Sequence, residues 1–268
     1  MSQIPLFLSG KSCNDIGYVI GVIHGDGYIT PTRLKLEAKD MDFVEAFSKS
    51  LTNISGLRLN GRRYSVFPYK RHGTYVTMGG DKNLVIWMKS IKNIYSELDS
   101  LLNKNKELSR GFLKGIFDSE GSNTKNSIFF SITDQHLIYL CKALLERHFN
   151  IRSNIFEIYQ KSNYKPEGYH YWRLAISTRR YMEKYMKEIS FSLKRKRLKI
   201  TKRPSRGGHW TKEELKYIKE NQEIHFDREI AENLNKDFGS YRTESSVTHK
   251  RQRMGLWREK GWNQTNMK

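Results

Sequence analysis

Hydrophobic positions change their spacing in the same order twice along the first 200 residues. A run with helical spacing over 14–25 is followed by residues 33–37, in which leucines alternate with polar side chains. The same succession returns as a helical run over 109–119 and an alternating run over 127–132. Alternation places every second side chain on one face of a strand, so these runs predict strands with one apolar face.

Each half continues with a helix (42–54 and 134–149), two further strands and a closing helix. The predicted order is therefore helix, two strands, helix, two strands, helix, and it occurs in tandem. We predict an α+β fold in which helices cover one face of each sheet. On the other face, which is polar, basic and aromatic, we expect Tyr75 and Thr77 in the first half and Tyr171 and Arg173 in the second.

Direct repetition of sequence points to a tandem duplication. Residues 17–27 recur as 111–121, and residues 86–91 recur more weakly as 184–189. Two echoes in the same order and at similar separations indicate that the halves differ by only a few inserted residues.

Small residues stand at every fourth position of the first helix in both halves. Each glycine inside a helix costs about 1 kcal/mol relative to alanine, so such a stripe needs a structural reason. Small faces let two helix backbones approach closely. We therefore expect the two helices to pack on each other, the alternative being that each packs tightly on its own sheet. The stripes are Gly17, Gly21 and Gly25, and Gly111, Gly115 and Ser119.

Facing stripes would bring Asp26 and Glu120 side by side at the C-terminal ends of the helices. A carboxylate there opposes the helix dipole, and a second carboxylate nearby raises the cost. A divalent cation such as Mg²⁺ (or Mn²⁺) would remove both penalties. The alternative is that each acid is only a turn residue before Gly27 or Gly121. Their matched positions in the repeat favour a metal site.

The two segments resemble the paired signature of the LAGLIDADG homing endonucleases, in a single chain that carries both half-domains. The resemblance covers residues 14 to about 200. It implies a pseudo-twofold monomer whose sheets lie in the major groove of double-stranded DNA. Proteins of this family cut both strands of a long, nearly palindromic site with a divalent metal and leave staggered ends.

The resemblance also implies roles for individual residues. Asp26 and Glu120 would be the metal-binding acids, and the backbone carbonyls of Gly25 and Ser119 would be secondary metal ligands. The family's basic residue near the scissile phosphate corresponds to Lys196 in the second half, with Lys104 or Lys106 in the first; a solvated surface lysine is the alternative at each position.

Charge agrees with a polyanionic partner. The chain has 48 Lys and Arg against 28 Asp and Glu, a formal net charge of +20, which excludes a typical metabolic enzyme and points to nucleic acid. The two cysteines exclude a disulfide scaffold. No apolar run has membrane-spanning length, and the opening residues lack a secretory signal. We expect a cytoplasmic, nucleoid-associated or organellar-matrix protein that is neither secreted nor bound to a membrane.

The expected DNA contacts are basic and aromatic side chains on the predicted sheets and in the run 194–206, which holds eight cations and no acid. Such a run is either a solvated linker or a phosphate-binding segment. The expected contacts are Arg33, Lys35, Arg62, Arg63, Lys70, Arg71, Tyr75, Lys125, Tyr171, Arg173, Lys194, Arg195 and Arg197.

The C-terminal residues predict three short helices, with Thr211, Asp227 and Thr243 as N-caps. They resemble the Myb/SANT-like helix-turn-helix modules, which implies that the last, basic helix enters the DNA. A bundle that binds another protein is the alternative. The side chains of the last helix that would contact DNA are Ser245, Ser246, His249, Lys250 and Arg253.

We therefore divide the chain into two half-domains (1–103 and 104–192), a basic linker (193–208) and a helix-turn-helix domain (209–268). The predicted function is a Mg²⁺-dependent, site-specific DNA endonuclease that hydrolyses phosphodiesters. Two alternatives use the same fold without cleavage: a maturase that binds intron RNA, and a DNA-binding repressor.

Overall fold

The computed structural model describes residues 4–56, 64–69, 72–124, 126–162, 165–197, 210–238 and 240–258. The chain divides into two compact units, Met1–Thr201 and Lys202–Lys268, and each is described by itself. Among the described helices, none combines the length and the apolar character that a membrane span requires.

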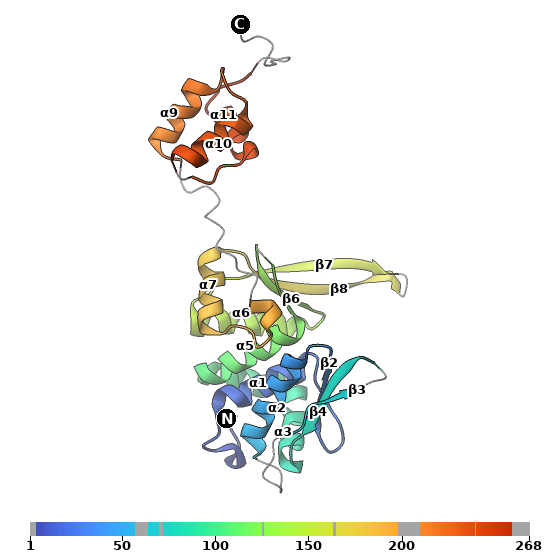
Figure 1. Cartoon of the computed structure of the whole chain (residues 1–268). Helices are drawn as coiled ribbons and strands as arrows, with labels where there is room; N and C mark the ends of the chain where they lie inside the picture. Colours follow the sequence, from blue (N-terminus) through green and yellow to red (C-terminus); the bar gives the residue numbers. More distant parts are fainter. Residues whose placement is uncertain are drawn as a thin grey trace. The chain divides into compact units, whose positions relative to one another are not determined.

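The first half of the larger unit begins with a short 3₁₀ helix and then alternates helices with strand pairs (Figure 1). Its strands form an antiparallel sheet in the order β1-β2-β4-β3. The elements are η1 (Leu6–Leu8), α1 (Cys13–His24), β1 (Tyr28–Ile29), β2 (Leu34–Ala38), α2 (Met41–Ser55), β3 (Phe67–Tyr69), β4 (Thr74–Gly79), α3 (Lys82–Asn93) and the connecting helix α4 (Tyr95–Lys104).

The second half repeats this order with a longer hairpin. Its sheet has the equivalent order β5-β6-β8-β7. Its elements are α5 (Lys106–Glu120), β5 (Gly121–Asn123), β6 (Ile128–Ile132), α6 (Gln135–Phe149), β7 (Asn154–Ser162), β8 (Lys165–Ile176), α7 (Arg179–Glu188) and α8 (Lys194–Arg197). The predicted α+β order, with two four-stranded sheets in the part of the chain described, is confirmed.

Helices α1 and α5 lie side by side with their glycine stripes in contact (Figure 1). A Cβ added at Gly115 would lie 2.6 Å from the carbonyl oxygen of Tyr18, and one at Gly21 would meet the carbonyl of Phe112. Added Cβ atoms at Gly17 and Gly111 would likewise strike backbone oxygens of the opposite helix. The prediction that the two stripes face each other is therefore confirmed.

Both of these helices begin earlier than the sequence predicts. Helix α1 is capped by the Ser12 hydroxyl, which accepts from the Asp15 N–H at 3.2 Å. Helix α5 is capped by the Asn105 side chain, which accepts from the N–H groups of Glu107 and Leu108. Ser109, the predicted cap, is buried inside the helix, where its hydroxyl donates to the Leu102 carbonyl. The connecting helix α4 was not predicted.

The strand register separates a face covered by helices from an open face. Leu174 and Ile176 of β8 are fully buried under the helices, so Tyr171 and Arg173 lie on the open face, as expected. The expectation for Tyr75 and Thr77 is wrong. Tyr75 pairs with Ala38 and packs against the hydrophobic core, and Thr77 pairs with Leu36 and is fully buried.

The orientation of β4 was predicted wrongly because valine and methionine alternate in it with tyrosine and threonine. Either face of the strand could therefore be apolar. Pairing with β2 turns Thr77 toward the helices, and its buried hydroxyl is satisfied by donating to the Ser65 carbonyl at 2.9 Å.

The smaller unit consists of α9 (Lys212–Asn221), α10 (Asp227–Asp237) and α11 (Glu244–Arg253) around five buried side chains. Two buried ion pairs tie the helices together. Glu214 pairs with Arg242, whose guanidinium lies 3.8 Å from the ring centroid of Trp210, and Asp227 pairs with Arg251. The apolar side chains of this small core are Ile218, Ile230, Ala231, Leu234 and Val247.

We predict that Gly111→Ala lowers the free energy of unfolding of the larger unit by about 3 kcal/mol, because the new methyl group would force the two backbones apart. Urea unfolding of the full chain, followed by circular dichroism, measures the change.

Ser119→Ala is the matched control, since it lies in the same stripe and already carries a Cβ. It loses one hydrogen bond, from Ser119 Oγ to the Gly115 carbonyl, and we expect it to cost about 1 kcal/mol. Equal effects of the two substitutions would contradict the close backbone contact.

Candidate functional site

Two carboxylates meet where α1 and α5 end. Asp26 follows α1 by two residues, and Glu120 is the last residue of α5. The helices are still close here, because a Cβ added at Gly25 would lie 2.6 Å from Ser119 Oγ and 3.7 Å from Glu120 Cγ. Asp26 is solvent-accessible and Glu120 is half-buried. The structure thus brings together the four residues expected to hold a metal.

The two carboxyl groups stand in an unfavourable electrostatic position. Loss of hydration raises the pKa of Asp26 above its usual value, and the nearby Lys196 ammonium opposes this rise. Loss of hydration also raises the pKa of Glu120, and the charge on Asp26 raises it further. Both acids lie at helix C-termini, where the dipole disfavours a negative charge. A bound cation would relieve all of these costs.

The donors present fit a hard divalent cation. Mg²⁺ is held in many proteins by one or two carboxylates, with water and phosphate oxygens completing its coordination. Asp26 and Glu120 supply that number of carboxylates, and the carbonyls of Gly25 and Ser119 are at the same helix ends. Across the described ranges, no three His, Cys, Asp or Glu side chains converge on one possible metal position.

Lys196 is buried, and its charge acts on both acids, opposing the rise in their pKa values. Its Nζ donates to the carbonyl oxygens of Phe117 at 3.1 Å and Asp118 at 2.5 Å, at the C-terminal end of α5. Burial lowers the pKa of Lys196 to about 8, against the opposing influence of Asp118 and Asp26. Lys196 falls within the predicted linker, but it was also the lysine expected near the acids, and the structure places it close to them.

The first half supplies a different lysine from the one expected. Lys106 and Lys104 stand at the start of α5 and the end of α4, about 20 Å along α5 from Glu120 at a rise of 1.5 Å per residue. Lys92 of α3 instead donates from Nζ to the Ile23 carbonyl at 2.8 Å. Ile23 occupies in the first signature segment the place that Phe117 occupies in the second.

Sequence reasoning missed Lys92 because the two lysines come from non-equivalent positions of the repeat. Lys92 belongs to the helix α3 itself, whereas Lys196 follows α7 by several residues. What distinguishes Lys92 is its proximity to the C-terminal end of α1, and only the tertiary structure shows this.

A groove of about 480 Å³ leads from Glu120 onto the open face of the second sheet. Arg173 lies in it, where its Nε donates to Ser131 Oγ at 3.0 Å and its guanidinium lies 4.6 Å from the ring centroid of Phe129. The other lining residues are Ser131, Ile132, Thr133, Gln160, Tyr169 and Tyr171. Two of the expected DNA contacts, Tyr171 and Arg173, are therefore continuous with one of the acids.

The first sheet carries fewer of the expected contacts within the described residues. Lys35 lies on the open face between Tyr28, whose ring centroid is 5.1 Å from its Nζ, and Glu37, at 3.4 Å. Arg33 is exposed in the loop before β2. Five further expected contacts lie outside the described residues: Arg62, Arg63, Lys70, Arg71 and Lys125.

The first part of the predicted linker is folded onto the larger unit. Leu193 is buried, Arg195 pairs with Asp40, and Arg197 donates to the carbonyls of Phe191 and Ser192. The dense run of cations predicted a linker here, and the burial of Leu193 and Lys196 depends on contacts between residues far apart in the chain. Lys194 and Arg197 are exposed.

In the smaller unit, four of the five expected contacts of the predicted recognition helix α11 lie at the surface, and the fifth is part of the N-terminal cap. Ser245, His249 and Arg253 are exposed and Lys250 is half-exposed. Ser246 serves as a cap instead, since its hydroxyl accepts from the Thr243 N–H at 2.9 Å.

Comparison with known proteins agrees with this geometry. Residues 107–190 match the model of the LAGLIDADG-like domain. MJ0398, an uncharacterized protein of Methanocaldococcus jannaschii, is 30% identical over 209 residues, which cover 73% of this chain and 73% of that protein. MJ0314 of the same organism is 29% identical over 166 residues, covering 58% and 60%.

Solved structures share the fold. A double variant of the homing endonuclease I-DmoI, bound to nicked target DNA in the presence of Mn, has a TM-score of 0.50 at 17% identity and covers 67% of this chain and 97% of its own. Full-length WhiA from Thermotoga maritima has a TM-score of 0.48 at 16% identity and covers 94% and 93%. Other I-DmoI complexes with DNA contain Mn or Ca.

The larger unit is thus a protein of the LAGLIDADG fold, and its second half contains a LAGLIDADG-like domain. The chain belongs to the same family as MJ0398 of Methanocaldococcus jannaschii.

We predict that Glu120→Gln raises the melting temperature of the metal-free protein by about 2 °C or more near neutral pH. The pKa of Glu120 is raised in the folded state, so its ionisation destabilises the fold as pH rises through that pKa, and the neutral amide avoids this cost. Calorimetry near neutral and near acidic pH measures the gain, which should shrink at the acidic end.

Glu37→Gln is the control of opposite sign. A hydrogen bond from Thr74 and the neighbouring Lys35 lower the pKa of Glu37, so its charge favours the folded state and its loss should not raise the melting temperature. A drop in melting temperature for Glu120→Gln would contradict the strained position assigned to this acid.

Proposed function

We propose that this protein is a metal-dependent, site-specific endonuclease that makes a staggered double-strand break in a long, nearly palindromic DNA site. The observation that carries the proposal is the pair of carboxylates at the ends of two glycine-faced helices, at the head of a groove on an open sheet face. Loss of hydration at both acids, and the effect of the Asp26 charge on Glu120, make their charged forms a cost in the absence of a ligand.

Asp26 and Glu120, with the carbonyls of Gly25 and Ser119, would hold Mg²⁺ or Mn²⁺. Such an ion supplies charge stabilisation for a pentavalent phosphate and lowers the pKa of water. The site is accessible from solvent through Asp26, so a phosphodiester could reach it without a change of fold.

Lys196 would act on the phosphate from the protein side. An ammonium group has three N–H donors, and two of them are engaged by the carbonyls of Phe117 and Asp118. The third would donate to a phosphoryl oxygen brought against the acids. With a pKa of about 8, the group is mostly protonated near neutral pH and can serve as a hydrogen-bond donor to developing negative charge. Lys92 would have the same role at the matched position of the first half.

The open sheet faces would contact the DNA. The major groove admits a two-stranded ribbon, and β7 and β8 form a long hairpin of that kind (Figure 1). Arg173 and Tyr171 lie on its open face beside Glu120, and Lys35 lies on the open face of the first sheet. The net charge of +20 supplies the sequence-independent attraction to phosphates.

The smaller unit would extend the footprint as a helix-turn-helix module, with α11 as its recognition helix. Its exposed side chains, the cap at Thr243 and the basic run that precedes the unit support this reading. The proposed sequence contacts are Ser245, His249, Lys250 and Arg253.

The first experiment is cleavage of a randomised duplex library by the full chain with Mg²⁺, in parallel with Ca²⁺ and EDTA, followed by sequencing of the ends. Mg²⁺-dependent cuts at one long site with staggered ends are the expected result. Selective binding without cuts in any metal would overturn the nuclease and leave the DNA-binding repressor or the intron-RNA maturase, between which binding to each nucleic acid decides.

We predict that Asp26→Asn and Glu120→Gln each reduce double-strand cleavage at least a hundredfold, because each removes a charge that binds the metal. DNA affinity should change less than threefold, because neither substitution removes a cation that faces the DNA. Single-turnover cleavage and filter binding in Ca²⁺ measure the two effects.

Glu45→Gln is the matched control. Glu45 is an exposed acid of the same unit on α2, away from the helix ends, and its loss should leave the cleavage rate unchanged. Full activity of either site variant would remove the proposed mechanism.

A second prediction concerns the smaller unit. Deleting residues 207–268 should weaken DNA binding and flatten its salt dependence, since the logarithmic salt slope grows by about 0.9 for every phosphate contact. Affinity measured over a series of salt concentrations gives the slope. The paired substitutions Lys250→Ala and Arg253→Ala, in the intact chain, should lower the slope by about 2 without removing the unit. An unchanged slope in both variants would contradict a DNA-binding role.

A further inference from the structure

Asp118 is a buried acid that the proposed chemistry leaves without a role. It lies in α5, two residues before Glu120, and is 1% exposed. Its carboxylate accepts from the hydroxyl of Tyr18 at 2.9 Å and from the backbone N–H of Ser192 at 2.9 Å and 3.1 Å. A carboxylate so deeply buried is costly unless hydrogen bonds compensate it, and here they come from α1 and from the segment after α7.

The segment after α7, residues 190–197, carries Lys196 to the site. It starts at Ser190, a non-glycine residue with φ of +62°, and passes through the buried Leu193. Asp118 contacts this segment twice: its side chain holds the Ser192 N–H, and its own carbonyl accepts from Lys196 Nζ. Asp118 therefore holds both the backbone of the segment, at Ser192, and the ammonium group of Lys196.

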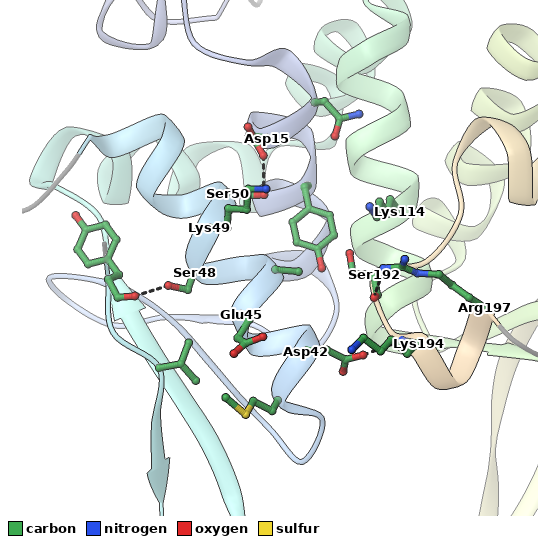
Figure 2. Close-up of a pocket in the computed structure, with 16 residues that line it drawn as sticks. Asp15, Asp42, Glu45, Ser48, Lys49, Ser50, Lys114, Ser192, Lys194 and Arg197 are labelled. Carbon is green, nitrogen blue, oxygen red and sulfur yellow. Dashed lines mark hydrogen bonds between the residues drawn. The ribbon is translucent and has the colours of Figure 1, made fainter. Parts of the chain in front are cut away.

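The outer side of the segment is fastened to the first half of the protein. The Lys194 N–H donates to Asp42 at 2.7 Å, and Arg195 forms a two-pronged pair with Asp40. Figure 2 shows Lys194 beside Asp42, with Ser192 and Arg197 on the same side of the pocket, across from α2. These outer contacts are more exposed than those of Asp118, so they hold the segment less firmly.

Among the described residues of the first half, no equivalent of this arrangement is present. His24 stands at the position matching Asp118, and an imidazole has no carboxylate with which to hold a backbone N–H as Asp118 does. Lys92 needs no separate segment, because it is part of the helix α3. The two lysines donate to matched carbonyls, at Ile23 and Phe117, but Lys92 is held by a helix and Lys196 by the segment after α7.

We propose that Asp118 is the positioning residue for Lys196, and that it thereby controls cleavage of only one of the two DNA strands. The inference rests on the proposed function, with Lys196 and Lys92 serving opposite strands. In Asp118→Asn the amide keeps the volume but has one acceptor oxygen where the carboxylate has two, so the Ser192 N–H and the Tyr18 hydroxyl can no longer donate to separate oxygens. The segment then loosens, and a displacement of about 1 Å of a positioned group can cost a hundredfold in rate.

The test uses the full chain and a duplex target with each strand labelled separately, under single-turnover conditions. Asp118→Asn should slow one strand at least about tenfold, leave the other within about twofold, and accumulate nicked DNA. DNA affinity in Ca²⁺ should stay within threefold. Tyr18→Phe is the matched control: it removes a hydrogen bond to the same carboxylate but leaves the bonds from the Ser192 backbone N–H to Asp118 in place, and the ratio of the two strand rates should change far less than in Asp118→Asn.

Amide hydrogen exchange of the DNA-free protein provides a readout that needs no cleavage. Asp118→Asn should speed exchange at Ser192 and over 193–197 relative to α1 and α5, whereas Tyr18→Phe should not. If Asp118→Asn does not fold, Asp40→Asn takes its place, since it removes an exposed contact of the same segment and should give the same strand bias in smaller measure.

The outcomes separate the inference from the proposed function. Cleavage by the wild type with equal slowing of both strands in the variant overturns the positioning role and keeps the nuclease. A wild type that cuts neither strand overturns the nuclease; unchanged exchange over 190–197 then overturns the positioning role as well, and faster exchange there supports it.

Discussion

The close contact between the backbones of α1 and α5 is the constraint on which the rest of the larger unit depends. Carbonyl oxygens of each helix occupy the space that a Cβ of the other would need, so the helices are held at a spacing that only glycine permits. Because the same contact continues to Gly25 and Ser119, it also brings Asp26 and Glu120 together. One interface, between α1 and α5, therefore both holds the two halves together and forms the proposed site.

Around this axis the two halves are alike in order and unlike in detail. Each presents one sheet with a covered and an open face, and each directs a lysine at a carbonyl near the end of its first helix. The second half adds a longer hairpin, a buried aspartate and a terminal segment. The same frame therefore carries two sites that differ in how they are supported.

The sequence was most informative where a physical requirement recurs at a fixed spacing. The glycine stripes, the acids that follow them and the alternation in β2 and β6 could be predicted because each follows from local geometry. Tyr75 was misplaced because β4 has no clear apolar face, so pairing with β2 decides its orientation. Lys92 and the folded part of the predicted linker depend on contacts between residues far apart in the chain, which spacing does not reveal.

The facing stripes also bear on how the chain acquires its structure. Gly17 meets Leu108 and Phe112, and Gly25 meets Ser119, so the first helix finds its partner surface nearly one hundred residues later in the sequence. During synthesis, the glycine stripe of α1 stays without its packing partner until α5 has left the ribosome. The first half can therefore complete its helix pairing only once the second half has been made.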